Sequence, residues 1–193
     1  KGPMFYFQDR IGQNGIPFKI YKLRSMIVNA EKAGAVFASI NDSRVTTFGK
    51  VIRKSRLDEI PQFINILKGD MAVIGPRPER PIFVNEIAEV MPFYETRHVI
   101  KPGLTGWAQV NGRNELSWSE KLIYDQWYIK RKSFFFDLFI LARTMPVWLK
   151  KEGIYTKDGK MMPELKVISS EDKSKPTTPT IIIFFFISKI VGY

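Results

Sequence analysis

The sequence contains no cysteine and a single histidine, His98, among its 193 residues. The lack of cysteine excludes disulfides, thiolate zinc sites, iron–sulfur clusters and cysteine nucleophiles, and one histidine cannot build a multi-histidine metal site. Acidic side chains must therefore hold any metal ion, and carboxylate oxygens favour Mg²⁺. The sequence also lacks a run of about 18 apolar residues, the length that a membrane-spanning helix needs.

Acidic residues are scarce relative to basic ones. The chain has 19 Asp and Glu against 30 Lys and Arg, which gives a net charge of +11. Such a chain is expected to bind polyanions: nucleic acid, phosphorylated metabolites or an anionic membrane face. Hydrophobic residues make up 45% and charged residues 25%, which indicates a folded globular protein. The length is sufficient for one domain with a sizeable core.

The apolar periodicity predicts an α/β fold, a compact single domain dominated by helices with a few short β-strands. Strands are expected as a hairpin around residues 12–15 and at residues 71–74 and 107–110, with a loop over 101–106. Helices are expected over residues 26–38, 45–56, 58–67, 82–90, 116–129 and 134–150. The domain is expected to cover residues 1–155. A tail or linker over 156–193 follows, with an apolar segment at 181–193 whose role is open.

Two adjacent carboxylates, Asp58 and Glu59, follow a basic stretch. Because proline is tolerated only in the first turn of a helix, Pro61 places the helix start near Asp58, which would make Asp58 the N-cap. The helix dipole and the nearby arginines would then keep Asp58 ionised. An ionised carboxylate in this position can attack phosphorus or hold Mg²⁺. The alternative is a capping aspartate surrounded by solvated charges.

Two further segments could bind an anionic ligand. Three prolines in residues 75–81 would hold Arg77 and Arg80 in fixed directions, and the planar guanidinium group suits phosphate. Residues 98–113 are rich in glycine and offer the polar side chains of Gln109, Asn111 and Arg113. The alternatives are a rigid connecting loop for the first segment and an ordinary hairpin for the second.

The aromatic segment over residues 134–151 is flanked by Lys and Arg at both ends. This pattern suits a membrane-interface helix, and an ordinary core helix is the alternative.

Five motifs occur in one order over roughly residues 2–155, and together they resemble the bacterial sugar transferase family of monotopic polyprenyl-phosphate phosphoglycosyl transferases. The motifs are KLRSM (22–26), SRLDEIPQ (55–62), GDM (69–71), GPRPE (75–79) and KPGLTGWAQVNGR (101–113). Each motif alone is weak, but five in family order are highly specific. The family includes members that use N-acetylated amino sugars, galactose and glucose.

The resemblance implies an enzyme that transfers a phosphosugar from a UDP-sugar to polyprenyl (undecaprenyl) phosphate, releases UMP and initiates glycoconjugate or exopolysaccharide synthesis. It implies that Asp58 is the nucleophile, which forms a covalent phosphosugar intermediate, and that Mg²⁺ is required. Glu59 would be a metal ligand or a proton acceptor, and both carboxylates are candidate metal ligands. The candidate phosphate- or nucleotide-binding residues are Arg53, Arg77, Arg97 and Gln109.

The resemblance also implies an anionic membrane surface as partner, at the cytoplasmic face of the bacterial inner membrane. Family members begin with a hydrophobic re-entrant helix directly before a segment like residues 2–5, so we expect a catalytic domain without its anchor, either soluble or peripheral. A nucleic-acid-binding domain is disfavoured because the chain has no RNP-like, zinc-finger or helix-turn-helix pattern. A conventional nucleotide-sugar glycosyltransferase is disfavoured because there is no Asp-x-Asp motif. A non-catalytic membrane-surface scaffold stays open.

Overall fold

The computed structural model describes residues 2–32, 34, 38–39 and 42–150, with the side chains of 147–150 excepted. The domain predicted over residues 1–155 is therefore described as far as residue 150, and the predicted tail over 156–193 lies outside the described residues. Among the described residues, no helix is both long and apolar enough to cross a membrane.

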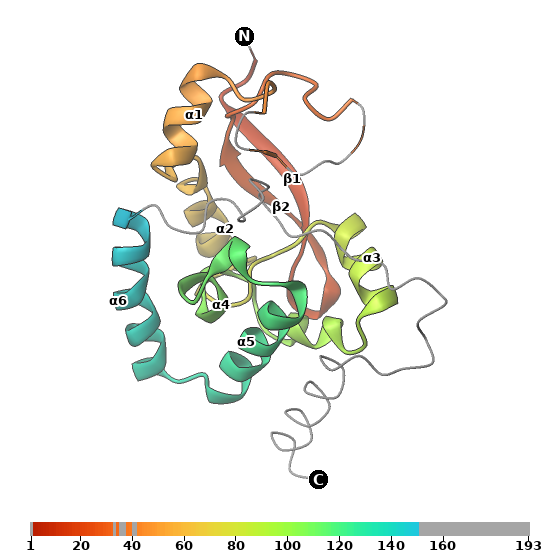
Figure 1. Ribbon diagram of the computed structural model, residues 1–193, viewed down its shortest axis with the longest axis vertical. Helices are drawn as coiled ribbons and strands as arrows, with labels where there is room; N and C mark the ends of the chain where they lie inside the picture. Colours follow the sequence, from red (N-terminus) through yellow and green to blue (C-terminus); the bar gives the residue numbers. More distant parts are fainter. Residues whose placement is uncertain (1, 33, 35–37, 40–41, 151–193) are drawn as a thin grey trace.

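The described chain contains one antiparallel hairpin and one short parallel strand pair within a body of helices (Figure 1). The strands are β1 (Phe5–Ile11), β2 (Pro17–Leu23), β3 (Ala72–Ile74) and β4 (Gly103–Thr105). The helices are α1 (Thr47–Lys54), α2 (Gln62–Lys68), α3 (Pro81–Val90), α4 (Trp107–Val110), α5 (Trp118–Arg131) and α6 (Phe134–Lys150). Short 3₁₀ turns include Leu57–Glu59 and Tyr94–Val99. The predicted helix-dominated α/β class is confirmed.

The hairpin is confirmed with a continuous register from Phe5 opposite Leu23 to Ile11 opposite Pro17. The prediction of a helix over 26–38 is wrong for the part that is described. Residues 28–32 form turns, Asn29 has a left-handed φ of 65°, and Met26 makes an isolated antiparallel bridge to Val45. A left-handed residue ends a right-handed helix, so the alanine-rich composition did not decide the local conformation.

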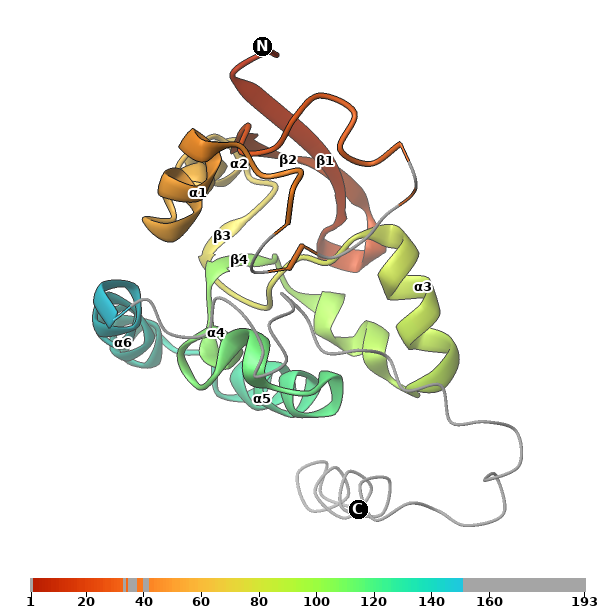
Figure 2. The ribbon, with the colours of Figure 1, turned by 45° about the horizontal axis from the view of Figure 1, so that its top comes forward.

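The strand predicted at 71–74 is confirmed as β3, but the strand predicted at 107–110 is wrong. The loop expected over 101–106 contains β4, which pairs in parallel with β3, and the strand expected over 107–110 is helix α4. Gly75 and Gly103 explain the pairing, because a side chain at either position would collide with the backbone of the other segment. Figure 2 shows this pair between the hairpin and helices α4, α5 and α6.

Two clusters of buried apolar side chains hold these parts together. One joins the end of β1 to α3, the 3₁₀ turn at Tyr94–Val99 and α5. The other joins β3 to α4, α5 and α6, and Ile140 of α6 is completely buried in it. α5 contributes to both clusters and begins with a complete capping box, in which Ser117 and Glu120 bond each other's backbone N–H groups.

Gly49 allows α1 to pack directly against the backbone at Ser25, because a side chain there would overlap the Ser25 carbonyl group. We expect Gly49→Ala to lower the free energy of unfolding by about 1–3 kcal/mol through overpacking. Urea denaturation measures this, with exposed Lys50→Ala as the control within about 0.5 kcal/mol of the wild type. Unchanged stability of Gly49→Ala would contradict the close contact.

Candidate active site

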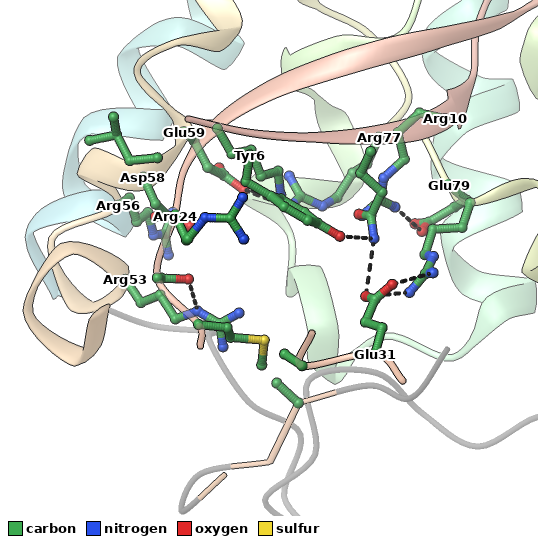
Figure 3. A pocket seen from close by; sticks show the side chains of 18 of the residues that line it. Tyr6, Arg10, Arg24, Glu31, Arg53, Arg56, Asp58, Glu59, Arg77 and Glu79 are labelled. Atoms are coloured by element: carbon green, nitrogen blue, oxygen red, sulfur yellow. Dashed lines mark hydrogen bonds and ion pairs between the residues drawn. The ribbon is translucent and has the colours of Figure 1, made fainter. Parts of the chain in front are cut away.

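A cavity of about 280 Å³ opens beside the hairpin and contains both predicted catalytic carboxylates (Figure 3). Among the described residues, eight basic and four acidic side chains line it. They are Arg10, Lys22, Arg24, Arg53, Arg56, Arg77, Arg80 and Arg113, together with Glu31, Asp58, Glu59 and Glu79. The excess of positive charge suits a ligand that carries two or more negative charges.

Glu59 lies at the centre of this charge cluster and is only 8% exposed. Its Oε1 accepts a hydrogen bond from Arg77 Nη2 at 2.7 Å and lies 3.8 Å from Lys22 Nζ. Its Oε2 lies 3.8 Å from Arg113 Nη2. Burial alone would raise the pKa of Glu59, but the three cations outweigh burial and hold that pKa well below its usual range. Glu59 is therefore a fixed anion.

The cations around Glu59 are themselves desolvated. Burial lowers the pKa of Lys22 to about 8 and that of Arg113 to about 9, although Glu59 opposes both shifts. Buried cations of this kind gain when an anionic ligand enters, because a phosphate restores part of the solvation that they lost on folding.

Asp58 lines the same cavity, but its pKa is shifted in the opposite direction from that of Glu59. Burial and the neighbouring Glu59 raise its pKa, while Lys22, Arg53 and Arg77 lower it less. These cations favour the ionised form of Asp58, but less strongly than burial and Glu59 oppose it, because Lys22 and Arg77 pair with Glu59. A pair of carboxyl groups with pKa values moved apart is typical of sites where the two have different tasks. The more basic Asp58 oxygen is the better nucleophile.

The prediction that Asp58 caps a helix is wrong. Asp58 lies in the 3₁₀ turn Leu57–Glu59, directly after Arg56, whose φ is 58°. Helix α2 begins later, at Gln62, with Pro61 in the capping position. The left-handed residue turns the chain before the carboxylates, so the turn rather than a helix dipole presents Asp58 to the cavity.

Arg53, in the last turn of α1, also faces the cavity. Its Nε donates to Ser25 Oγ at 2.8 Å, which fixes the guanidinium group. Its Nη1 is buried and has no hydrogen-bond acceptor within the described structure. A buried donor without an acceptor is costly, so this atom is suited to an anionic ligand in the cavity.

Two predicted ligand-binding residues lie outside this cavity. Arg97 is 3% exposed and forms an ion pair with Asp125, and Gln109 Nε2 donates to the Gly75 carbonyl oxygen at 3.3 Å. The structure thus brings Asp58, Glu59, Arg53 and Arg77 together and places Arg97 and Gln109 behind them. Lys22 and Arg113 were missed as partners of Glu59, although both stand within the recognised motifs.

The carboxylates fit a metal ion only in combination with a ligand. Within the described ranges, no group of three or more acidic or histidine side chains could hold a metal by itself. Mg²⁺, however, commonly takes one or two carboxylates and completes its octahedral shell with phosphate oxygens and water. Asp58 and Glu59 provide oxygen donors of this type at the cavity wall.

Arginine and lysine side chains gathered in one cavity beside two carboxylates suit a ligand that carries phosphate groups. The sequence model of the bacterial sugar transferase family matches residues 1–151, and the chain belongs to this family.

Several bacterial sugar transferases have sequences similar to this chain. The chain is 47% identical over 147 residues to the UDP-N-acetylgalactosamine-undecaprenyl-phosphate N-acetylgalactosaminephosphotransferase of Aeromonas hydrophila, a match that covers 75% of this chain and 35% of the relative. It is 42% identical over 156 residues to the uncharacterized sugar transferase EpsL of Bacillus subtilis, a match that covers 79% of this chain and 73% of the relative. It is 41% identical over 149 residues to the UDP-glucose:undecaprenyl-phosphate glucose-1-phosphate transferase of Escherichia coli, a match that covers 75% of this chain and 32% of the relative. The chain thus spans about a third of the Aeromonas and Escherichia proteins.

The buried environment of His98 predicts that the stability of the fold depends on pH in the acid range. Its Nε2 is buried without a partner among the described residues, and burial, with a smaller effect of Arg97, lowers its pKa to about 4. The unfolded chain binds this proton near pH 6.5, so the free energy of unfolding should decrease as pH falls from about 6.5 to about 4. We expect His98→Phe to reduce this slope in urea denaturation. An unchanged slope would show that His98 is not responsible.

Proposed function

We propose that this chain carries the catalytic site of an enzyme that transfers a sugar phosphate from a UDP-sugar to undecaprenyl phosphate. The observation that carries the proposal is the cavity in which Asp58 lies beside a Glu59 that is already neutralised by cations. The activities in the names of the Aeromonas and Escherichia relatives support this reaction class and its two substrates. The sugars in those names differ, so the choice of sugar is to be determined with a panel of UDP-sugars.

Binding is the first task of the cations. A UDP-sugar brings at least two negative charges toward a carboxylate, and this approach is repulsive unless the phosphate oxygens are neutralised. Arg53 offers an unused donor, and Lys22 and Arg77 line the same cavity. These three side chains would hold the diphosphate, and Glu59 would keep Arg77 in place through their ion pair.

Asp58 then performs the chemistry in two displacements. A carboxylate oxygen of Asp58 attacks the phosphorus that bears the sugar, the bond from that phosphorus to the bridging oxygen breaks, and UMP leaves with the electron pair. An oxygen of undecaprenyl phosphate next attacks the same phosphorus and releases the Asp58 carboxylate. Each displacement exchanges one phosphorus–oxygen bond for another, so no oxidant or reductant is needed.

Asp58 and Glu59 are the residues that would hold Mg²⁺ together with the diphosphate. The ion would supply positive charge to the phosphate oxygens as charge develops on the leaving group. Glu59 Oε2 would be the freer ligand, because its nearest cation, Arg113, lies at 3.8 Å, whereas Oε1 bonds Arg77 at 2.7 Å.

The proposed lipid substrate requires a membrane, and one side of the molecule is suited to it. Exposed apolar side chains gather on the segment that carries the active-site turn and on α6. They are Phe48, Val51, Leu57, Ile60, Phe63, Ile64 and Leu67 on the first, and Phe134, Phe135, Leu138, Phe139, Leu141 and Met145 on α6. Figures 1 and 2 both show α1 and α6 along the same side of the molecule. We call these thirteen residues the apolar face.

Exposed basic residues lie in or directly beside the segments that form the apolar face. Lys50 and Lys54 are exposed on α1, and Arg131 and Lys132 are exposed where α5 joins α6. Each cation close to an anionic bilayer contributes about 1 kcal/mol to binding. Asp58 lies in the turn between α1 and α2, so a membrane on the apolar face would bring a lipid phosphate close to the nucleophile.

The two carboxylates should respond differently to removal of their charge. Asp58→Asn should abolish UMP release in the presence of undecaprenyl phosphate and leave the free energy of unfolding within about 1 kcal/mol of the wild type. Glu59→Gln should impair release and also lower stability by about 3–5 kcal/mol, because it leaves buried cations unpaired. Release by Asp58→Asn within tenfold (about 1.4 kcal/mol) of the wild type would refute the nucleophile assignment.

Membrane binding can be tested by flotation with anionic vesicles at low salt. We expect the wild type to float and a Phe48→Ser, Phe63→Ser, Leu67→Ser variant to float much less, because apolar insertion is lost. The matched control is Ile16→Ser with Ile82→Ser, which removes exposed apolar side chains from the hairpin loop and α3. Equal flotation of both variants would show that the apolar face does not mediate binding.

A further inference from the structure

The backbone of residues 76–79, which include the Pro-Arg-Pro sequence, is held in place by hydrogen bonds to its carbonyl oxygens. Four consecutive carbonyl oxygens, those of residues 76–79, accept hydrogen bonds from Gly103 N at 2.8 Å, Arg97 Nη2 at 3.0 Å, Arg10 Nη1 at 3.1 Å and Ile11 N at 2.9 Å, in that order. Proline has no N–H group, so this segment cannot form a regular strand ladder. Two backbone N–H groups and two arginine side chains from elsewhere in the chain fix its backbone instead.

Arg97 is the most deeply embedded of these donors. Besides the Arg77 carbonyl, its guanidinium group bonds Asp125 Oδ2 through Nε at 2.9 Å and through Nη2 at 2.7 Å, and it bonds the Tyr94 hydroxyl oxygen through Nη1 at 2.7 Å. Arg97 and Asp125 are 3% and 2% exposed. The pair connects α5 to the backbone of Arg77.

A fully buried ion pair is weak evidence for stability, because the cost of desolvation offsets the attraction between the charges. In this structure the pair has a defined geometric effect, because it fixes the backbone at Arg77. The residue whose carbonyl Arg97 holds is the one whose side chain donates to Glu59 at 2.7 Å. A displacement of this backbone would move the Arg77 guanidinium group away from both Glu59 and the cavity.

We infer that Arg97 and Asp125 form a positioning pair that sets the place of Arg77, and that Arg97 does not itself bind phosphate. This inference rests on the proposed function and deepens it, because it assigns the binding geometry of a diphosphate to two residues outside the cavity. Lysine at position 97 would keep the charge but lose the fork that contacts Asp125, Tyr94 and the Arg77 carbonyl together.

A double-mutant cycle on UMP release tests the inference. Arg97→Lys should lower kcat/KM at least tenfold when residue 77 is arginine, but less than about threefold in an Arg77→Lys background, because residues that act through one another are not additive. A purely structural effect would give the same factor in both backgrounds and would overturn the inference. Ile140→Ala is the control for lost stability, since Ile140 is a fully buried residue of α6 in the cluster that contains neither Tyr94 nor Arg97.

A second variant avoids leaving one buried charge alone. Arg97→Met combined with Asp125→Leu replaces the pair by apolar side chains of similar size, a type of change that folded proteins tolerate. Its crystal structure should show the contact between Arg77 Nη2 and Glu59 Oε1 lengthened beyond hydrogen-bonding distance. A contact preserved at 2.7 Å would overturn the inference. If the wild type releases no UMP from any UDP-sugar, the proposed function fails, and this crystal structure still decides the positioning.

Discussion

The ion pair between Glu59 and Arg77 is the interaction on which the site depends. Glu59 lies in the turn after α1, Arg77 in the proline-rich segment after β3, and the two further cations in β2 and just beyond α4. One buried carboxylate therefore joins four segments that are distant in the sequence. Because its removal would leave several buried cations unpaired, the cluster is expected to assemble as a unit or not at all.

The same cluster explains how neighbouring carboxylates acquire different properties. The nearest cations form ion pairs with Glu59, which therefore stays ionised. The negative charge of Glu59 then adds to the effect of burial in raising the pKa of Asp58. An identical pair exposed to water would titrate normally. The left-handed turn at Arg56 completes the arrangement, because it directs Asp58 to the cavity instead of making it the start of α2.

The sequence predicted the parts of the fold that depend on local patterns. The hairpin, α1, α3, α5 and α6 follow from apolar periodicity and turn residues. The β3–β4 pairing did not, because it depends on two glycines that allow distant backbones to approach. The site shows the same division. The resemblance predicted six site residues, of which Asp58, Glu59, Arg53 and Arg77 line the cavity, whereas Arg97 and Gln109 lie outside it. No local pattern distinguishes a ligand contact from a contact that supports it.

Mass spectrometry of the protein mixed with a UDP-sugar and Mg²⁺ in the absence of lipid acceptor tests the central claim most directly. If Asp58 is the nucleophile, the first displacement should proceed without the second, and the peptide that contains residues 57–59 should gain the mass of one sugar phosphate. Fragmentation should place that mass on Asp58, and Asp58→Asn should show none. A sugar phosphate attached to Glu59, or turnover without any adduct on Asp58, would contradict the account.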